Sequence, residues 1–454
     1  MFFDITFIIL ICYLIMIISI GVFTRKKALT TTGFFLADRN IGWKALAATI
    51  TATTVGGSAT IVAGGRIFQL GLPGLWYDIA GAIGLIVLGI FLAKKIRATS
   101  LITLPDITGS LYDTKVRTAS AVLIVITEIA WIALLIQSSS LILSILLPVD
   151  YIIILVFTTA IFVAYTLIGG QYAVIYTDII QFLIMLVGIC FIAAPSLLFE
   201  AAPHLHLISS TQLQFPINEN LGLLSVISIF FMMFFPHVVG PDIYSKILSA
   251  KDERQARTGS IYAGIFKLIF AIAIGIIALT ATVLPGIQQS ITNPYMALPI
   301  AVSTLHPVLA GIILAAFIST MMSSADSCLL SAGTILSVDI TKKNTVRTSQ
   351  IGILLIGVAA LLLALYHSLL GSILDTLQLA YTVFTAGLTL PVLFGFYKER
   401  TKVTTTGALW SLIIGGGGSL IFLQIKPYDT YAVIVGLILS FIPLVVFRNG
   451  KQTK

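Results

Sequence analysis

Residues 320–327 set hydroxyl groups and a carboxylate inside a long apolar segment that runs from about 308 to 338. At about 100° per residue, the polar side chains of this segment fall within roughly one 100° arc of a helix. They are Thr320, Ser323, Ser324, Ser327, Ser331 and Thr334, with Asp326 at the edge of the arc. Serines in membrane helices also bond their own backbone or join helices. A carboxylate at membrane depth, however, is unfavourable unless it is paired, hydrated or bound to a cation. Hydroxyls beside an acid suit a hard cation, so we predict a sodium or proton site.

Four other ionisable side chains in apolar segments are candidates for function. Asp178 is a second intramembrane acid, about two turns from one end of its segment. Glu128 shares a helix face with Trp131, three residues later. Asp242 and Lys267 have two interpretations that the sequence leaves open: they pair with each other, or they contact a substrate.

The composition is typical of a polytopic membrane protein. Of 454 residues, 58% are hydrophobic and only 10% are charged, and the mean hydropathy is +1.07. The net charge of +8 does not indicate nucleic-acid binding, because the basic residues stand in short gaps between apolar segments. The partners that we expect are a small-molecule solute and the lipid bilayer, with no nucleic acid and no obligatory protein partner.

Apolar runs of about 18 residues or more predict thirteen transmembrane helices. They lie near 5–23, 42–68, 73–93, 118–147, 151–168, 173–198, 222–247, 258–284, 297–339, 349–366, 370–397, 405–424 and 428–447. The seventh is interrupted and the ninth is over-long. The first is followed by basic residues, so we interpret it as a retained span and not as a cleaved signal peptide.

The basic residues predict the orientation, because cytoplasmic gaps carry an excess of Lys and Arg. An N-terminus outside and a C-terminus in the cytoplasm place 23 of the 26 basic residues on the cytoplasmic side. They are Arg25, Lys26, Lys27, Arg39, Lys44, Lys94, Lys95, Arg97, Lys115, Arg117, Lys246, Lys251, Arg254, Arg257, Lys342, Lys343, Arg347, Lys398, Arg400, Lys402, Arg448, Lys451 and Lys454. We therefore expect a multi-pass protein of the cytoplasmic membrane.

Two predicted spans contain residues that break helices. The second has a β-branched and Gly-Gly patch at 48–58, and the seventh has two prolines within 234–242. Gly56 and Pro236 each stand 14 residues after the predicted start of their span, at 42 and 222. Matched interruptions in two halves are typical of secondary transporters built from inverted repeats.

This pattern predicts a single transmembrane transporter domain over 1–454. Its two core repeats of five helices cover about 42–198 and 222–397. One extra helix precedes the repeats, at 5–23, and two follow them, at 405–424 and 428–447.

Other functions fit the sequence less well. Cys12, Cys190 and Cys328 lie in apolar segments and have no metal-ligand spacing. An enzyme is disfavoured, because no His cluster and no nucleophile with an adjacent base is present. A channel is disfavoured as well, because an over-long helix and two broken ones suit an occluded site better than a continuous pore. We expect sodium as the coupling ion and no organic cofactor.

Three motifs, spread over nearly the whole chain, resemble the sodium/solute symporter family. The first is the Gly-Gly pair at 169–170 with residues 173–181 after it. The second is residues 322–327 with the Val-Asp-Ile sequence at 338–340, which is especially similar to the high-affinity choline transporter branch. The third is 52–57 followed by Leu-Pro-Gly at 72–74, which is also similar to the proline permeases.

The resemblance implies a LeuT-type fold with a conserved sodium site. Its ligands would be the carbonyls of Ala52, Val55 and Thr320 and the hydroxyls of Ser323 and Ser324. A second sodium site, described for the sialic-acid branch, would correspond to Asp178, Ser323, Asp326 and Ser327. Asp326 stands where that branch has a serine, so a proton could replace the second sodium.

The implied function is sodium-coupled import of a small polar organic solute, amino-acid-like, quaternary-amine or similar, by alternating access. The alternative is proton-coupled symport that uses Asp178 and Asp326. The candidate substrate residues lie at the two breaks and on the faces described above. They are Thr54, Gly56, Glu128, Trp131, Pro241, Asp242 and Lys267.

Overall fold

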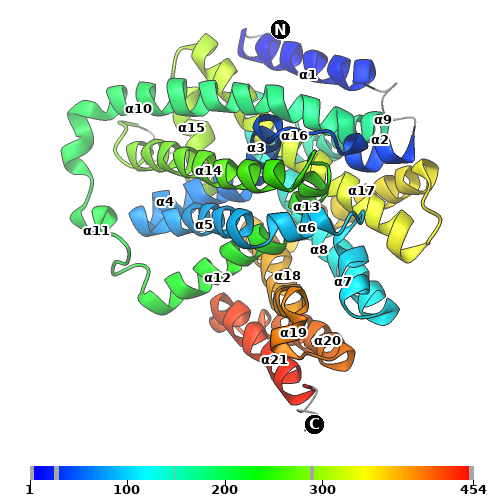
Figure 1. Cartoon of the computed structure of the whole chain (residues 1–454). Coiled ribbons are helices and arrows are strands. Elements are labelled where there is room, and N and C mark those ends of the chain that lie inside the picture. The colour runs from blue at the N-terminus through cyan, green and yellow to red at the C-terminus, as the bar shows by residue number, and fades with distance from the viewer. Residues whose placement is uncertain (1–4, 25–29, 148, 287–290, 449–454) are drawn as a thin grey trace, which may run out of the picture.

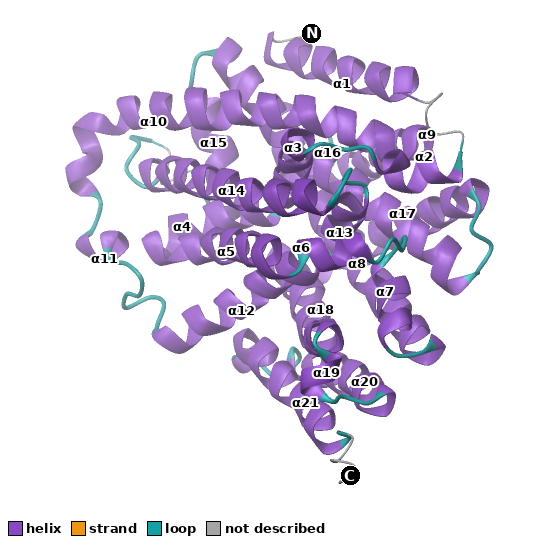
Figure 2. Cartoon of the chain, in the orientation of Figure 1, coloured by secondary structure: helices purple, strands orange, loops and turns teal. Residues whose placement is uncertain are grey.

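The computed structural model describes residues 5–24, 30–147, 149–286 and 291–448, which form helices joined by loops (Figure 2). Within these ranges extended residues form only isolated bridges, so the predicted all-α class is confirmed there. The α-helices are α1 (Ile5–Thr24), α2 (Thr31–Leu36), α3 (Trp43–Thr54), α4 (Ala63–Leu70), α5 (Trp76–Phe91), α6 (Ala93–Ala98), α7 (Leu104–Leu111), α8 (Thr114–Leu146), α9 (Tyr151–Met185), α10 (Ala194–Ala201), α11 (Ser210–Leu213), α12 (Leu223–Val239), α13 (Pro241–Leu248), α14 (Glu253–Ala281), α15 (Ala297–Ser303), α16 (Pro307–Ile335), α17 (Val346–Leu370), α18 (Ile373–Phe396), α19 (Lys398–Thr401), α20 (Thr405–Phe422) and α21 (Ala432–Val446). Short 3-10 or π segments are η2 (Ala37–Arg39), η3 (Ser58–Val62), η4 (Leu72–Leu75), η5 (Leu186–Ala193), η6 (Ala202–Leu207), η7 (Pro294–Met296), η8 (Leu336–Ile340) and η9 (Tyr428–Tyr431).

Many of these helices are long and apolar enough to cross a membrane. The described residues contain ten such spans, or eleven when one bent pair is taken as a span. Shorter apolar helices at Ile5–Ile20 and Tyr151–Leu167 coincide with the first and fifth predicted spans. The chain is therefore polytopic, as its composition predicted.

The predicted ninth span, 297–339, is wrong in its first part. Residues 297–303 form the separate short helix α15, and α16 begins only at Pro307. The reason is local, because a proline is favoured in the first turn of a helix. The side chain of His306 also caps the new helix by accepting from the backbone N–H of Val308. The hydroxyl-bearing stretch thus lies on a single helix.

The hydroxyl-rich helix α16 lies at the centre of the bundle. In the most apolar 18-residue stretch of the span that contains α16, 83% is buried inside the protein. The corresponding share is 39% for the spans that contain α20 and α21. Helices α1, α3, α8, α9 and α17 pack around α16. Figure 1 shows α16 in the middle of the molecule, α1 at its upper edge and α20 and α21 at its lower edge.

The predicted break in the second span is confirmed. Helix α3 ends at Thr54, and the helix that continues from Ser58 to Leu70 is bent by 63° from it. Between them, Val55 leaves the helical region with φ −97° and ψ 60°. Glycine is needed at position 56, because a Cβ there would lie 2.4 Å from Ser324 Oγ. The break therefore brings its backbone directly against α16.

The second break lies four residues later in the chain than the sequence predicted. Pro236 stays inside α12, which continues to Val239, and Gly240 is the extended residue before α13. The prolines explain the shift, because Pro241 starts the new helix at its first position while Pro236 is accommodated within an existing one. The matched spacing of Gly56 and Pro236 is therefore not the spacing of the two breaks.

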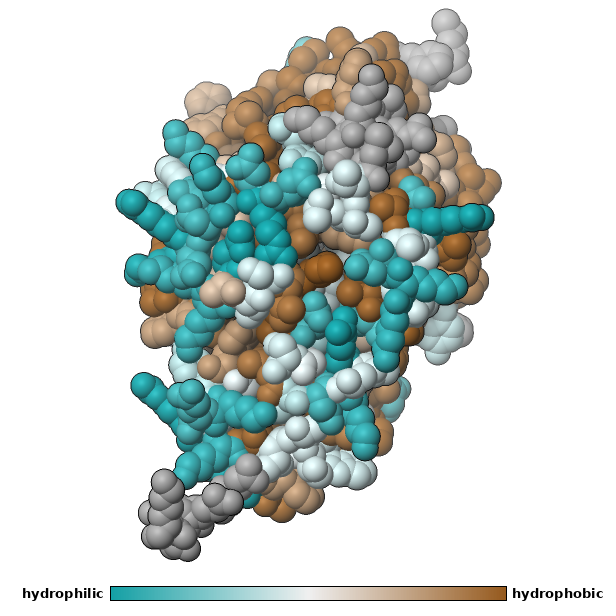
Figure 3. All heavy atoms as spheres, turned by 45° about the vertical axis from the view of Figure 1, so that its right-hand side comes forward, coloured by the Kyte–Doolittle hydropathy of each residue, from teal (hydrophilic) through white to brown (hydrophobic). Residues whose placement is uncertain are grey.

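The segments that join the predicted cytoplasmic ends of the spans meet at one end of the molecule. Figure 3, turned so that the side of α7 and α17 comes forward, shows hydrophilic side chains gathered there between hydrophobic ones. Side-chain bonds that link these segments are Arg39–Ser100 (2.7 Å), Arg97–Ala250 (2.6 Å), Arg117–Asp339 (2.8 Å), Arg117–Asp106 (2.9 Å) and Lys398–Leu111 (2.7 Å). Segments far apart in the sequence thus share one polar surface.

Candidate functional site

The broken end of α3 meets the hydroxyl face of α16. A helix end leaves its last four carbonyl oxygens without intrahelical partners. Here Ser323 Oγ donates to Ala52 O at 2.8 Å, and Ser324 Oγ donates to Thr53 O at 2.7 Å. Because these contacts join residues 271 positions apart, the hydroxyls of α16 hold the end of α3 in place.

The predicted sodium ligands converge around these contacts. The carbonyl of Thr320 accepts from Ser324 Oγ at 2.9 Å and from Ser323 Oγ at 3.2 Å. Ala52 and Ser323 are therefore neighbours, as a shared ion requires, and Val55 directly follows the last residue of α3. All of these candidate ligand atoms are oxygens, which is the ligand type that a hard alkali cation prefers. Among the described residues no group of three or more His, Cys, Asp or Glu side chains has the arrangement of a metal site.

The two predicted acids lie beside this oxygen cluster. Ser327 Oγ lies 3.0 Å from Thr53 Oγ1 and 3.4 Å from the carboxylate of Asp326. Asp178, on α9, accepts from the hydroxyl of Thr49 on α3. The structure thus brings Asp178, Asp326 and Ser327 together, as the resemblance implied.

One basic residue of this centre was assigned wrongly from the sequence. Lys246 was counted in a cytoplasmic gap, yet its side chain is fully buried and its Nζ lies 2.9 Å from Asp178 Oδ2. The physical reason is that α13 continues inward from the second break and packs against α3 and α16. A buried carboxylate such as Asp178 needs a cation beside it. That need could have led us to look for a buried lysine in the sequence.

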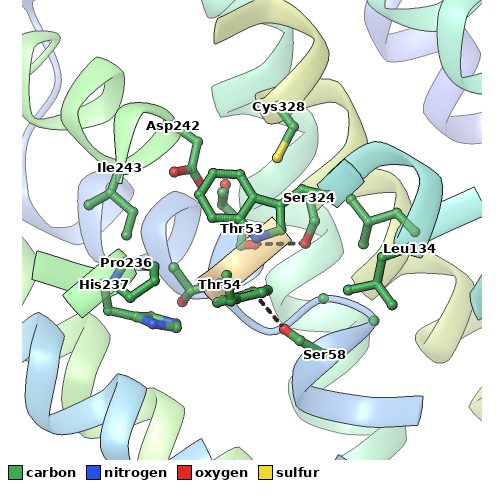
Figure 4. A pocket seen from close by; sticks show the side chains of 15 residues that line it. Thr53, Thr54, Ser58, Leu134, Pro236, His237, Asp242, Ile243, Ser324 and Cys328 are labelled. Carbon is green, nitrogen blue, oxygen red and sulfur yellow. Dashed lines mark hydrogen bonds between the residues drawn. The ribbon is translucent and has the colours of Figure 1, made fainter. Parts of the chain in front are cut away.

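A small cavity, with about 50 Å³ of space for water-sized molecules, lies next to the oxygen cluster, between the two breaks (Figure 4). Of the predicted substrate residues, Thr54, Gly56, Trp131 and Asp242 line it. Figure 4 shows Asp242 on one side, Pro236 and His237 below it, and Leu134 opposite. The lining mixes apolar side chains with a few polar groups, as the lining of a small-molecule site does.

The other predicted substrate residues lie outside the lining of this cavity. Glu128 is buried and interacts with Cys328, which does line it. Pro241 instead borders a smaller pocket on the other side of the break. Glu128 and Pro241 are therefore placed to support the cavity wall.

Lys267 pairs with Asp78 and not with Asp242, which excludes the first of the two interpretations that the sequence left open. Its Nζ lies 3.4 Å from Asp78 Oδ1 on α5 and donates to Thr54 O at 2.5 Å. The ammonium thus binds another carbonyl at the broken end of α3. Asp242 is half-buried at the cavity, and no lysine of the described structure pairs with its carboxylate by direct contact.

Aromatic residues complete the cavity, and the sequence identified only one of them. Trp131 contacts Tyr381 edge to face at 5.3 Å and Phe384 at 4.9 Å between ring centroids. Tyr381 Oη lies 2.9 Å from Ser58 Oγ, so α18 is joined to the segment after the first break. Tyr381 was missed because it lies far along the chain from both breaks, and nothing in the sequence shows that α18 packs beside them. A half-buried acid with aromatic rings beside it suits an ammonium group.

Comparison with solved structures shows the fold. A structure titled as a substrate-bound outward-open state of a Na+-coupled sialic acid symporter superposes with a TM-score of 0.82 at 17% identity, covering 99% of both chains. A closed conformation of Mhp1, a nucleobase-cation-symport-1 family transporter, gives a TM-score of 0.62 at 15% identity, covering 91% of this chain and 93% of that one. At these identities the likeness concerns the fold, which is the LeuT type.

Comparison of sequences shows the family. The osmoregulated proline transporter OpuE of Bacillus subtilis is 26% identical, covering 95% of this chain and 92% of that protein. High-affinity choline transporter 1 of Caenorhabditis elegans is 26% identical, covering 78% of this chain and 68% of that protein. The family model described as the sodium:solute symporter family matches residues 34–415. The chain therefore belongs to the sodium:solute symporter family.

Proposed function

We propose that this protein is a sodium-coupled secondary active symporter that imports a small polar organic solute by alternating access. The observation that carries the proposal is the contact between Ser323 and Ser324 and the released carbonyls of α3. These contacts form an all-oxygen cluster beside the cavity between the two breaks. Sodium that bridges α3 and α16 would stabilise one arrangement of the two helices, and so bias the transporter toward it.

The sodium ligands that we propose are the carbonyls of Ala52, Val55 and Thr320 and the hydroxyls of Ser323 and Ser324. Sodium would take lone pairs of the hydroxyl oxygens and of the carbonyls that already converge there. Sodium is then the coupling ion, and the mechanism needs no organic cofactor. The membrane potential contributes about 2.3 kcal/mol per 100 mV for each charge that moves inward.

We propose thirteen transmembrane helices in one transporter domain over 1–454. Ten spans, one bent pair and the helices Ile5–Ile20 and Tyr151–Leu167 support this number. The breaks before Ser58 and at Gly240 support two inverted repeats at about 42–198 and 222–397, with peripheral helices near 5–23, 405–424 and 428–447.

The protein would lie in the cell membrane with its N-terminus outside and its C-terminus in the cytoplasm. The support is the polar end at which the basic gaps meet, because cytoplasmic loops are rich in Lys and Arg. Lys426, in a predicted outer loop, pairs instead with Asp375 and Asp429.

The solute that the cavity favours carries an ammonium group. Asp242 supplies a half-buried carboxylate, and Trp131 and Tyr381 supply aromatic rings. Amino acids and betaines have this group, whereas sugars lack it. A thermal-shift screen of amino acids, betaines, sugars and monocarboxylates, with and without sodium, tests this, because a ligand stabilises the state that it binds.

Sodium dependence tests the ion site. Ser323→Ala and Ser324→Ala should each raise the sodium concentration needed for half-maximal uptake, and the double variant should raise it further. Ser260→Ala is a matched control, since Ser260 is buried and bonds only its own helix, at 2.9 Å to Ala256 O. Unchanged sodium dependence in the double variant would count against the site.

The alternative, proton-coupled symport that uses Asp178 and Asp326, is not favoured by membership in a sodium-coupled family. It also requires Asp178 to exchange protons while Lys246 lies 2.9 Å from it. Uptake that persists without sodium and follows an imposed pH gradient would select this alternative.

A further inference from the structure

Lys246 forms an ion pair in the interior of the bundle. It lies on α13, and its side chain and that of Asp178 on α9 both have no exposed surface. The two groups are 2.9 Å apart, and the hydroxyl of Thr49 donates to the same carboxylate oxygen. The ammonium is a compact positive charge, and it contacts the Asp178 carboxylate as a bound cation would.

A second carboxylate lies near the same ion pair. Asp326 on α16 interacts electrostatically with both Asp178 and Lys246. One oxygen of each acid, Asp178 Oδ1 and Asp326 Oδ2, is buried without a hydrogen-bond partner among the described residues. Other titratable groups that interact with one or both of these acids are Tyr13 on α1, Tyr165 on α9 and Cys328 on α16.

This centre adjoins the proposed sodium site. Ser327 Oγ, close to Asp326, is 3.0 Å from Thr53 Oγ1, and the carbonyl of Thr53 accepts from Ser324. Asp178, Asp326 and Ser327 are the residues that the sequence predicted for a second ion. In this chain an ammonium group already lies at that place.

We propose that Lys246 is a built-in cation that replaces a second coupling ion, so that this symporter binds one sodium ion per cycle. The proposal rests on the sodium-coupled function proposed above. The Lys246 ammonium lies 2.9 Å from Asp178 Oδ2, so it already holds the place that a second sodium would take at this carboxylate, whereas the sodium at Ser323 and Ser324 does not depend on Asp178. A second sodium would add an uncompensated charge in a region of low dielectric constant, where charge is strongly unfavourable.

In a second interpretation, the ion pair between Lys246 and Asp178 has a structural role only and holds α13 against α9. A purely structural link affects stability, but it does not change how many sodium ions the protein binds. The number of bound ions therefore separates the two roles.

The test counts sodium ions on the purified full-length protein in nanodiscs, by equilibrium binding of radioactive sodium without solute. The unmodified protein should bind one ion. Lys246→Gln should bind two, because it leaves two carboxylates without their ammonium. Lys246→Arg, which keeps the charge, should bind one, and the double variant Lys246→Gln/Asp178→Asn should return to one.

Two sodium ions on the unmodified protein, or a single ion on a folded Lys246→Gln variant, would overturn the proposal and leave sodium-coupled transport standing. No sodium on the unmodified protein would instead contradict the proposed function itself. If Lys246→Gln does not fold, Asp178→Asn decides. It should still bind one ion, and loss of binding would identify Asp178 as a sodium ligand and overturn the inference.

Discussion

Replacing Lys267 by methionine should destabilise the protein strongly, because it leaves Asp78 charged and unpaired inside the bundle. The two side chains are 1% and 2% exposed, and their charged atoms are 3.4 Å apart. At an effective dielectric constant of about 20, this separation corresponds to about 5 kcal/mol of attraction. Desolvation offsets part of it, and removing one partner of a buried pair typically destabilises by about 3–5 kcal/mol.

A double variant divides this loss into two parts. Lys267→Met/Asp78→Asn removes both charges, so the unpaired carboxylate disappears while the carbonyl of Thr54 still lacks the donor that it has at 2.5 Å. An unsatisfied buried carbonyl accounts for about 1–3 kcal/mol. The double variant should therefore be more stable than the single variant and less stable than the unmodified protein.

The measurement is the apparent melting temperature of the detergent-solubilised protein, followed by size-exclusion chromatography after heating. We expect Lys267→Met to lower it by several degrees and the double variant to recover part of that loss. Lys426→Met is the control, because Lys426 also pairs with carboxylates but is 61% exposed, and exposed pairs contribute little. Equal melting temperatures for the single and double variants would refute the buried ion pair.

Two further substitutions test the cavity and the first break. Asp242→Asn should weaken binding of an ammonium solute by about 10- to 150-fold, the loss of one charged hydrogen bond, with sodium binding unchanged. A variant that keeps full affinity in a thermal-shift titration would contradict the assignment. Gly56→Ala should raise the sodium concentration for half-maximal binding by about 5- to 150-fold, because its Cβ would lie 2.4 Å from Ser324 Oγ. Gly222→Ala, with no heavy atom within 4 Å of the added carbon, should leave sodium binding unchanged.

Local chemistry explains what the sequence could predict. The hydroxyl stripe of α16 was identifiable because helical periodicity alone puts Ser323 and Ser324 on one face. The break near Gly56 was identifiable because glycines and β-branched residues are poor helix formers. Both features depend on a few neighbouring residues. The position of the second break was wrong because proline either starts a helix or bends one, and the choice at Pro236 depends on packing.

Pairing between distant residues explains what the sequence could not predict. Lys246 is separated from Asp178 by 68 positions, and nothing in its own segment distinguishes it from the exposed Lys251 that follows. In the same way, Lys267 has two candidate acids, and only the packing of α14 on α5 selects Asp78 over Asp242. An intramembrane charge in a sequence indicates that a partner exists, but the partner can be identified only from the fold.

Coupling between ion and solute requires residues that both sites share, and the structure contains them. Ser324 and Thr53 line the solute cavity, and they also form one of the hydrogen bonds of the proposed sodium cluster. A sodium ion that fixes Ser324 therefore also fixes one wall of the cavity before the solute enters. By thermodynamic linkage, the factor by which sodium raises solute affinity equals the factor by which solute raises sodium affinity. Substitutions at Ser324 should therefore reduce both factors together. Asp242 borders the cavity but not the proposed sodium site, so Asp242→Asn should lower solute affinity without changing sodium binding.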